Sequence, residues 1–232
     1  MPRTSRYIPP QDAALHIMTR GNNHQCLFNS DEDKIRYLLL LRRLKDENNL
    51  DIFHYCLMNT HVHLIVWLRK NSCLSKFMKQ INLCYYNYYN KIYGYAGHLC
   101  QGRFKSNVID TDRYLLQCGK YIELNPVRAN MVNSPEAYRF SSYNYYAFGI
   151  PDSIISPSPT YSEISPKEEL RRKHYIKFVL DSSMVNSKIL DTQLFIGNDA
   201  FIAKQEERFK VKNISLVRGR PRKHMEPEGP EK

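Results

Sequence analysis

The sequence has no run of apolar residues that approaches the roughly 18 needed to cross a membrane as a helix. Its first ten residues, MPRTSRYIPP, also lack the apolar stretch of a secretory signal. A membrane-embedded protein and a membrane partner are therefore not expected. We expect a cytoplasmic protein.

The six cysteines contain no C-x-x-C pair and no zinc-ribbon spacing. A thioredoxin-type redox site and a cysteine-based zinc site are therefore not predicted. In a reducing cytoplasm, these residues are expected to act as small buried hydrophobic side chains. Tryptophan occurs once, whereas tyrosine occurs 17 times. Tyrosine can pack, stack on bases or act as a nucleophile, so its abundance selects none of these roles.

Negative charge is also in short supply, with 23 Asp and Glu against 34 Lys and Arg, which gives a net charge of +11. Such a surplus attracts polyanions, nucleic acid ahead of an anionic membrane surface. Hydrophobic residues make up 42% of the 232 residues and charged residues 25%, as in ordinary globular proteins. Disorder over the whole length is therefore not expected.

Hydrophobic periodicity predicts alternating strands and helices in the first two thirds of the chain. The predicted elements are a strand over 15–20, a helix over 32–48 capped by Asp31, strands over 51–58 and 61–68, a helix over 75–93, a strand over 103–110, and a helix from 111 or 112 to 124. Asn59 and Thr60 join two of the strands as a hairpin. This order predicts an α+β, ferredoxin-like domain, in which helices cover an antiparallel or mixed sheet.

The composition changes after residue 148, where we place the end of the main domain. Residues 151–166 hold four prolines and five serines, which is typical of a linker. The remaining predictions are a linker over 149–166, a small helical extension over 167–210 with helices at 167–180 and 198–209, and a basic, disordered tail over 211–232.

His61 and His63 are two residues apart on a predicted strand, so their imidazoles project from the same face. Two such rings can close around one metal ion. The alternative is a pair of histidines on the polar face of a strand, because H-x-H also occurs by chance.

Tyr121 and Asn125 are four residues apart, a spacing that brings two side chains to one face of a helix. The amide oxygen of Asn125 could then be a third, neutral metal ligand. Alternatively, Tyr121 is simply packed and Asn125 caps a new helix that begins at Pro126. Pro126 also disfavours helical geometry at Asn125, which weakens the spacing argument.

A site of two imidazoles and one amide would leave a divalent ion with its full charge, which favours phosphate at an open position. A nearby tyrosine could then attack phosphorus and form a phosphotyrosine. The phenol must lose its proton during the attack, and Lys120 or Arg128 could assist this loss.

Four blocks of sequence, in order, resemble the REP-associated tyrosine transposases, a branch of the single-tyrosine transposases in the HUH endonuclease superfamily. The blocks are MNTHVHLIV at 58–66, GHLCQGRFK at 97–105, YIELNPVRA at 121–129 and FSSY at 140–143. The resemblance extends over about residues 15–146. It implies a ferredoxin-like fold with a five-stranded sheet, cleavage of single-stranded DNA through a 5′-phosphotyrosine, strand transfer, and a requirement for Mg²⁺ or Mn²⁺.

By the same resemblance, His61 and His63 match the paired metal ligands, Tyr121 matches the nucleophile, and Asn125 matches the third ligand. Tyr114, two helical turns before Tyr121, ranks behind it mainly on this match. The family's usual turn has Pro-Asn before the first histidine, and this chain departs from it with Asn-Thr at 59–60.

Arginines and lysines supply the candidate DNA contacts. Arg103 and Lys105 alternate on a predicted strand, which suits phosphate contacts, although both could be solvated. The segment RGRPRK at 218–223 resembles an AT-hook, which lays arginines along the minor groove, and the alternative is a solvated basic tail. The full set of DNA-binding candidates is Arg20, Arg103, Lys105, Arg128, Arg218, Arg220, Arg222 and Lys223.

Together, these features predict a DNA transposase that cleaves and rejoins single-stranded DNA near hairpins of REP-like palindromic repeats, associated with the nucleoid through DNA binding. One alternative is a catalytically silent DNA-binding protein on the same fold. Another is a replication or conjugation nickase, which the absence of a helicase-sized extension makes less attractive. Monomer and homodimer both stay open, because no sequence feature identifies an interface.

Overall fold

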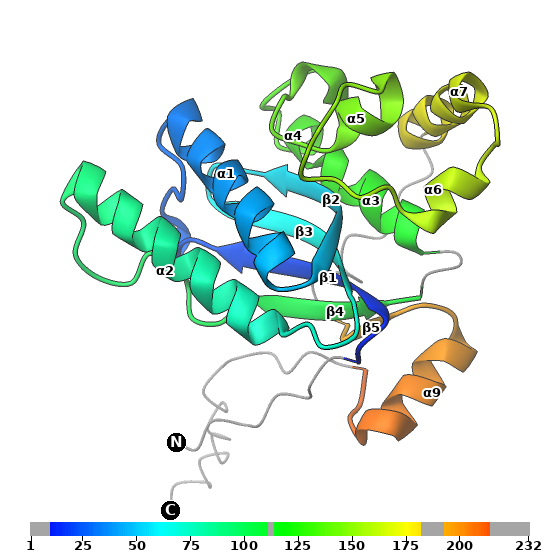
Figure 1. Cartoon of the computed structure of the whole chain (residues 1–232), viewed down its shortest axis with the longest axis horizontal. Coiled ribbons are helices and arrows are strands. Elements are labelled where there is room, and N and C mark those ends of the chain that lie inside the picture. The colour runs from blue at the N-terminus through cyan, green and yellow to red at the C-terminus, as the bar shows by residue number, and fades with distance from the viewer. Residues whose placement is uncertain (1–9, 111–113, 182–192, 214–232) are drawn as a thin grey trace, which may run out of the picture.

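A mixed five-stranded sheet forms the centre of the computed structural model, which describes residues 10–110, 114–181 and 193–213 (Figure 1). The strands are β1 (Ala13–Arg20), β2 (Leu50–Leu57), β3 (His61–Leu68), β4 (Lys105–Ile109) and β5 (Phe195–Ile196). Their order in the sheet is β2-β3-β1-β4-β5. The pairs among the first four are antiparallel, and β5 pairs with β4 in parallel. The predicted α+β fold is confirmed.

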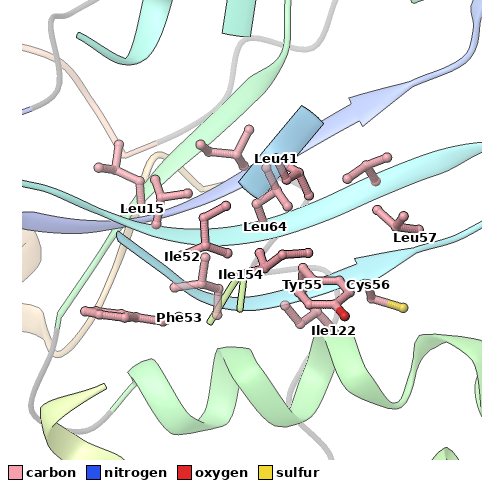
Figure 2. Close-up of a cluster of buried hydrophobic side chains, with 14 of the residues drawn as sticks. Leu15, Leu41, Ile52, Phe53, Tyr55, Cys56, Leu57, Leu64, Ile122 and Ile154 are labelled. Carbon is pink, nitrogen blue, oxygen red and sulfur yellow. The ribbon is translucent and has the colours of Figure 1, made fainter. Parts of the chain in front are cut away.

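Helices cover both faces of this sheet (Figure 1). The helices are α1 (Asp31–Glu47), α2 (Leu74–Tyr93), α3 (Leu115–Glu123), α4 (Asn125–Arg128), α5 (Tyr143–Phe148), α6 (Pro159–Glu163), α7 (Glu168–Leu180) and α9 (Asp199–Phe209). Short 3₁₀ turns lie at Asn22–His24 and Pro135–Ala137. Figure 2 shows Leu41 of α1 on one side of the strands and Ile122 of α3 on the other. The sheet is therefore buried on both faces.

Strand alternation divides the side chains of β1 and β3 between these two faces. Leu15 and Leu64 belong to the core on the α1 side (Figure 2). Their neighbours in sequence, His16 on β1 and His63 on β3, therefore point toward the side of α3. Polar residues on two central strands are thus gathered beneath one helix.

Ser30, rather than the predicted Asp31, caps α1. The Ser30 hydroxyl accepts a hydrogen bond from the amide of Asp33, and the Asp33 carboxylate accepts one from the amide of Ser30. This reciprocal capping box satisfies two amide groups of the first turn. Asp31 therefore lies inside the helix, where its charge favours the amino-terminal end.

The prediction that residues 149–166 form a linker is wrong, because this segment is folded against the domain. It contains α6, whose amino terminus is capped by Ser158 and has Pro159 in the first turn. Ile154, Ile155 and Tyr161 are buried, and the Tyr161 hydroxyl donates to the carbonyl oxygen of Tyr146. Proline here begins a helix rather than extending the chain.

Two segments from beyond β4 contribute to the edges of the sheet. On β2, isolated bridges join Ile52 to Ile155 and Cys56 to Ser141. On β4, the short β5 strand from the predicted helical extension pairs Phe195 with Val108. The predicted helical extension over 167–210 therefore also contributes a strand to the sheet of the main domain.

Some predictions concern residues that the structure places differently or does not describe. Cys26 and Cys73 are exposed rather than buried, whereas Cys56 and Cys118 are buried as expected. The predicted start of the helix at 111 or 112 and the AT-hook-like segment lie outside the described residues. Within the described ranges, none of the helices is long and apolar enough to span a membrane.

Candidate functional site

A cavity of about 290 Å³ lies between the sheet and the helix that carries Tyr121. Its lining residues are Met18, Arg20, His61, His63, Lys105, Tyr121 and Asn125. Six of these seven are residues that the sequence singled out. They come from β1, β3, β4, α3 and α4, so the tertiary fold, and not local spacing alone, brings them together.

The two histidines of β3 form one wall of this cavity. Their ring centres are 4.9 Å apart and the rings are nearly perpendicular, at 86°. In each ring the Nδ1 atom has a polar neighbour: the Thr60 hydroxyl at 3.0 Å from His61, and His16 Nε2 at 2.9 Å from His63. At His63, the contact at Nδ1 leaves Nε2 as the nitrogen that a ligand in the cavity would engage.

His63 is buried, whereas His61 is partly exposed. Burial lowers the pKa of His63 well below its ordinary value, and the neighbouring His16 and His61 lower it further. Its ring is therefore held in the neutral form, which is the form that coordinates a cation.

Tyr121 faces this pair from α3. Its ring centre lies 6.1 Å from that of His63, with the two rings nearly perpendicular, at 87°. The Arg128 guanidinium lies 4.8 Å from the centre of the Tyr121 ring and donates a hydrogen bond of 2.9 Å to the Tyr121 carbonyl oxygen. Arg128 thus fixes a positive charge beside the phenol, where negative charge on the oxygen is favoured.

Asn125 begins α4 after a break in the helix, as Pro126 predicts. The helix α3 ends at Glu123, and the cap position of α4 is Leu124 rather than Asn125. The Asn125 amide nitrogen donates to the carbonyl oxygen of Ile122 at 3.3 Å. Its amide oxygen is therefore the atom that could serve a cation in the cavity.

Lys120 and Arg103 do not take the positions expected of them. The Lys120 amine donates to the carbonyl oxygen of Asp181 at 2.7 Å and lies over the Phe178 ring, so it serves α7 rather than the phenol. Arg103 precedes β4, which begins only at Lys105, and it is exposed in a bend. The expected alternation of Arg103 and Lys105 on one strand face is therefore wrong, and only Lys105 lines the cavity.

Sequence reasoning missed a buried carboxylate two residues after Tyr121. Glu123 is fully buried, and its Oε1 accepts from His54 Nδ1 at 2.9 Å and from the Ser142 hydroxyl at 2.5 Å. Its Oε2 accepts from the Tyr175 hydroxyl at 2.7 Å. The helix that carries Tyr121 is thereby attached to β2, to the start of α5 and to α7. An acidic residue between the apolar Ile122 and Leu124 was the signal available in the sequence.

Close packing also fixes the distance between α3 and β2. A Cβ atom added at Gly119 would lie only 2.6 Å from the His54 ring. Any other residue at this position would push the helix away from the strand. Gly119 therefore sets the depth at which α3, and with it Tyr121, sits over the sheet.

The described residues contain no group of three or more His, Cys, Asp and Glu side chains that could hold a metal ion. In the cavity, the residues able to hold a divalent cation are His61, His63 and Asn125, which supply two nitrogens and one amide oxygen. This neutral donor set leaves room for further oxygen ligands.

The five-stranded sheet, the paired histidines on its central strand β3 and the facing tyrosine thus meet around one cavity. Residues 11–125 match the model of the family described as "Transposase IS200 like". Over these residues, nearly half of the chain, the protein is similar to the IS200-like transposases. No curated protein matches the chain.

The chain is also similar to solved structures. A REP-associated tyrosine transposase bound to a REP hairpin matches with a TM-score of 0.53 and 18% identity, over 67% of this chain and 92% of that chain. At this identity, the match shows a shared fold. A candidate transposase from Deinococcus radiodurans R1 (18% identity, TM-score 0.36, 53% and 95% covered) and tRNA(His) guanylyltransferase from Saccharomyces cerevisiae (10%, 0.41, 81% and 79%) match less well.

Proposed function

We propose that the protein cleaves and rejoins single-stranded DNA near hairpins of REP-like palindromic repeats, with Tyr121 as the nucleophile. The observation that carries this proposal is the position of the Tyr121 ring, 6.1 Å from that of His63 in a cavity shared with His61 and Asn125. The family match supports the class of reaction, and the hairpin-bound structural relative suggests the form of the DNA.

In this proposal, His61, His63 and Asn125 hold Mg²⁺ or Mn²⁺. The donor set fits such an ion, because two imidazoles and an amide oxygen line one cavity. When bound, the cation withdraws charge from the scissile phosphate and stabilises the negative charge that develops during attack. Imidazole nitrogens favour Mn²⁺, whereas phosphate oxygens accept either ion.

The Tyr121 oxygen attacks phosphorus, and the phenol proton is lost. The bond from phosphorus to the 3′ oxygen breaks, so a 3′ hydroxyl leaves and a 5′-phosphotyrosine remains. Attack by another 3′ hydroxyl on the same phosphorus then joins the strands and restores the phenol. Arg128, held against the ring, favours the anionic oxygen in both steps.

The DNA backbone is proposed to enter past Arg20 and Lys105, which line the same cavity. Arg20 lies at the end of β1, and Lys105 lies at the start of β4. Two cations in the cavity of the proposed reaction suit backbone contacts that fix the register of the strand. The basic residues Arg218, Arg220, Arg222 and Lys223 are proposed to add contacts of the minor-groove type.

One chain supplies both the phenol and the two imidazoles, so the proposed site needs no second subunit. We place the catalytic domain within residues 1–148. The segments that follow support it, since Tyr175 of α7 contacts Glu123 and β5 extends the sheet. A monomer is therefore sufficient for the proposed reaction.

A covalent-adduct assay tests this function. Purified protein is mixed with Mn²⁺ and a library of single-stranded REP-type hairpins, and a protein–DNA adduct is expected on denaturing gels. Tyr121→Phe should abolish the adduct, whereas the matched variant Tyr114→Phe should retain it. An adduct that persists in Tyr121→Phe would refute the assignment of Tyr121 as the nucleophile. DNA retardation without an adduct, across all hairpins and with either ion, would favour the catalytically silent DNA-binding alternative.

A further inference from the structure

A buried chain of polar side chains runs behind the cavity, across three strands of the sheet. His16 on β1 lies directly opposite Asn107 on β4 in the strand register. Its Nδ1 is 3.2 Å from the Asn107 amide oxygen, and its Nε2 is 2.9 Å from Nδ1 of His63 on β3. All three side chains are buried, with exposures of 2% for His16, 5% for Asn107 and 4% for His63.

The hydrogen bonds of Asn107 give this chain a direction. Its amide nitrogen donates to the carbonyl oxygen of Gln193, in the segment that leads into β5. The amide oxygen must then be the acceptor toward His16, so His16 carries its proton on Nδ1. In a neutral ring the Nε2 of His16 is an acceptor, and it receives the proton on Nδ1 of His63. The Nε2 of His63 is left with its lone pair.

We propose that His16 and Asn107 are positioning residues, which hold His63 in the Nδ1-protonated tautomer so that its Nε2 lone pair is the atom offered to a divalent cation. This inference rests on the proposed function, in which His63 is a cation ligand. The orientation of the ring is also fixed, because the His16 and His63 rings lie nearly in one plane, at an interplanar angle of 13° with centres 5.1 Å apart, as an in-plane hydrogen bond requires.

The two histidines of β3 differ in this respect. The partner of His61 Nδ1 is the hydroxyl of Thr60, which can rotate to donate or to accept. The Thr60 contact therefore does not select a tautomer. His63 is thus the histidine of the pair whose tautomer is selected by its hydrogen bond to His16.

The hydrogen bonds from His63 through His16 to Asn107 also connect the site to a part of the protein outside the matched family region. Gln193 lies beyond residues 11–125, yet its carbonyl oxygen sets the orientation of the Asn107 amide. In the same segment, β5 pairs with β4 through Phe195. The carboxyl-terminal segment thereby contributes to the geometry of His63 without lining the cavity.

The first test reads the tautomer directly, in metal-free protein labelled with ¹⁵N. Long-range ¹H–¹⁵N correlation spectra distinguish a protonated from an unprotonated ring nitrogen, and a His63→Gln sample assigns the signals. We expect His63 to show a protonated Nδ1 and an unprotonated Nε2 at pH 7.5. The opposite tautomer in the wild-type chain would overturn the inference, whatever the variants do.

The second test measures the affinity of the full chain for Mn²⁺ alone, by calorimetry or electron paramagnetic resonance, without DNA. His16→Phe keeps a ring but removes both nitrogens, and we expect it to weaken binding by about 10- to 100-fold, the range typical of such outer partners. His16→Gln offers an amide oxygen to His63 and should recover most of the affinity. His174→Phe, the same change at an exposed position on α7, should have no effect.

The controls separate this inference from the proposed function. If His63→Ala binds Mn²⁺ as well as the wild type, the metal site itself is refuted. If His63→Ala loses binding while a folded His16→Phe keeps it, the metal site stands and the positioning role is refuted. Asn107→Leu should weaken binding in the same direction as His16→Phe. If His16→Phe does not fold, the tautomer of the wild-type protein decides the question.

Discussion

The Tyr175 hydroxyl on α7 donates to the Glu123 carboxylate on α3 at 2.7 Å, and both side chains are fully buried. Glu123 lies two residues after Tyr121, on the same helix. A contact made 52 residues away in sequence therefore fixes the helix that presents the proposed nucleophile. The contribution of this hydrogen bond to stability can be measured with a substitution that removes only the hydroxyl oxygen of Tyr175.

Tyr175→Phe should lower the free energy of unfolding by roughly 1.5–3 kcal/mol, because a buried charged acceptor loses a donor. Tyr161→Phe is the matched control, since the Tyr161 hydroxyl is also buried but donates to a neutral carbonyl oxygen of Tyr146. Its loss should cost only about 0.5–1.5 kcal/mol. Urea unfolding compares the two variants, and equal losses would show that the charge on Glu123 adds nothing.

Arg128→Gln should slow adduct formation about tenfold, which corresponds to about 1.4 kcal/mol of activation free energy. The cause is the loss of the cation over the Tyr121 ring and of the hydrogen bond to its carbonyl oxygen. Single-turnover rates at saturating hairpin provide the measurement. Arg128→Lys keeps the charge but not the planar donor, so its rate of adduct formation should lie between those of the wild type and Arg128→Gln. An unchanged rate together with weaker DNA binding would assign Arg128 to DNA contact alone.

Lys105 and Arg103 offer a paired test of the proposed DNA path. Lys105→Gln removes a cation from the cavity, whereas Arg103→Gln removes one from an exposed bend outside it. We expect Lys105→Gln to weaken binding of the hairpin more, and to reduce the dependence of affinity on salt by the equivalent of about one phosphate contact. Fluorescence anisotropy over a range of salt concentrations gives both quantities. A larger loss in Arg103→Gln would move the path away from the cavity.

The buried His63 predicts a loss of stability in acid. Its pKa in the folded chain is well below the ordinary 6.5, so between these two values the unfolded state binds more protons. Stability contributed by neutral His63 is therefore present above about pH 6.5 and is lost as the pH falls below it, by at most about 1.4 kcal/mol per pH unit. The free energies of unfolding of metal-free wild type and His63→Gln are measured in urea between pH 7.5 and 5.5. The wild type should lose stability more steeply as the pH falls, by the contribution of His63. The exposed His174→Gln should retain the slope, and equal slopes in all three proteins would contradict the prediction.

The parts of the fold that depend on local pattern were predictable from the sequence. The alternation of β3 places His61 and His63 on one face, and a helical turn brings Tyr121 and Asn125 to the same cavity despite the break at Pro126. Each of these relations spans four residues or fewer, where backbone geometry alone sets the direction of the side chains.

Relations between distant segments were not predictable in the same way. No local pattern connects Asn107 to Gln193, and a two-residue strand such as β5 has no periodicity to detect. The role of Glu123 depends on His54 and Tyr175, which come from different elements. The end of a strand is also a tertiary property, which is why Arg103 was placed on β4 and lies outside it.

The coverage of both sheet edges has a consequence for how the molecule avoids association with itself. An outer strand with unsatisfied amide and carbonyl groups is a template for pairing with another copy. The bridges from Ile155 and Ser141 to β2, and the short β5 strand along β4, occupy part of each outer edge. Loss of the segment that contains Phe195 would expose the edge of β4 at the apolar residues Val108 and Ile109. This edge could then pair with a strand of another copy and promote aggregation.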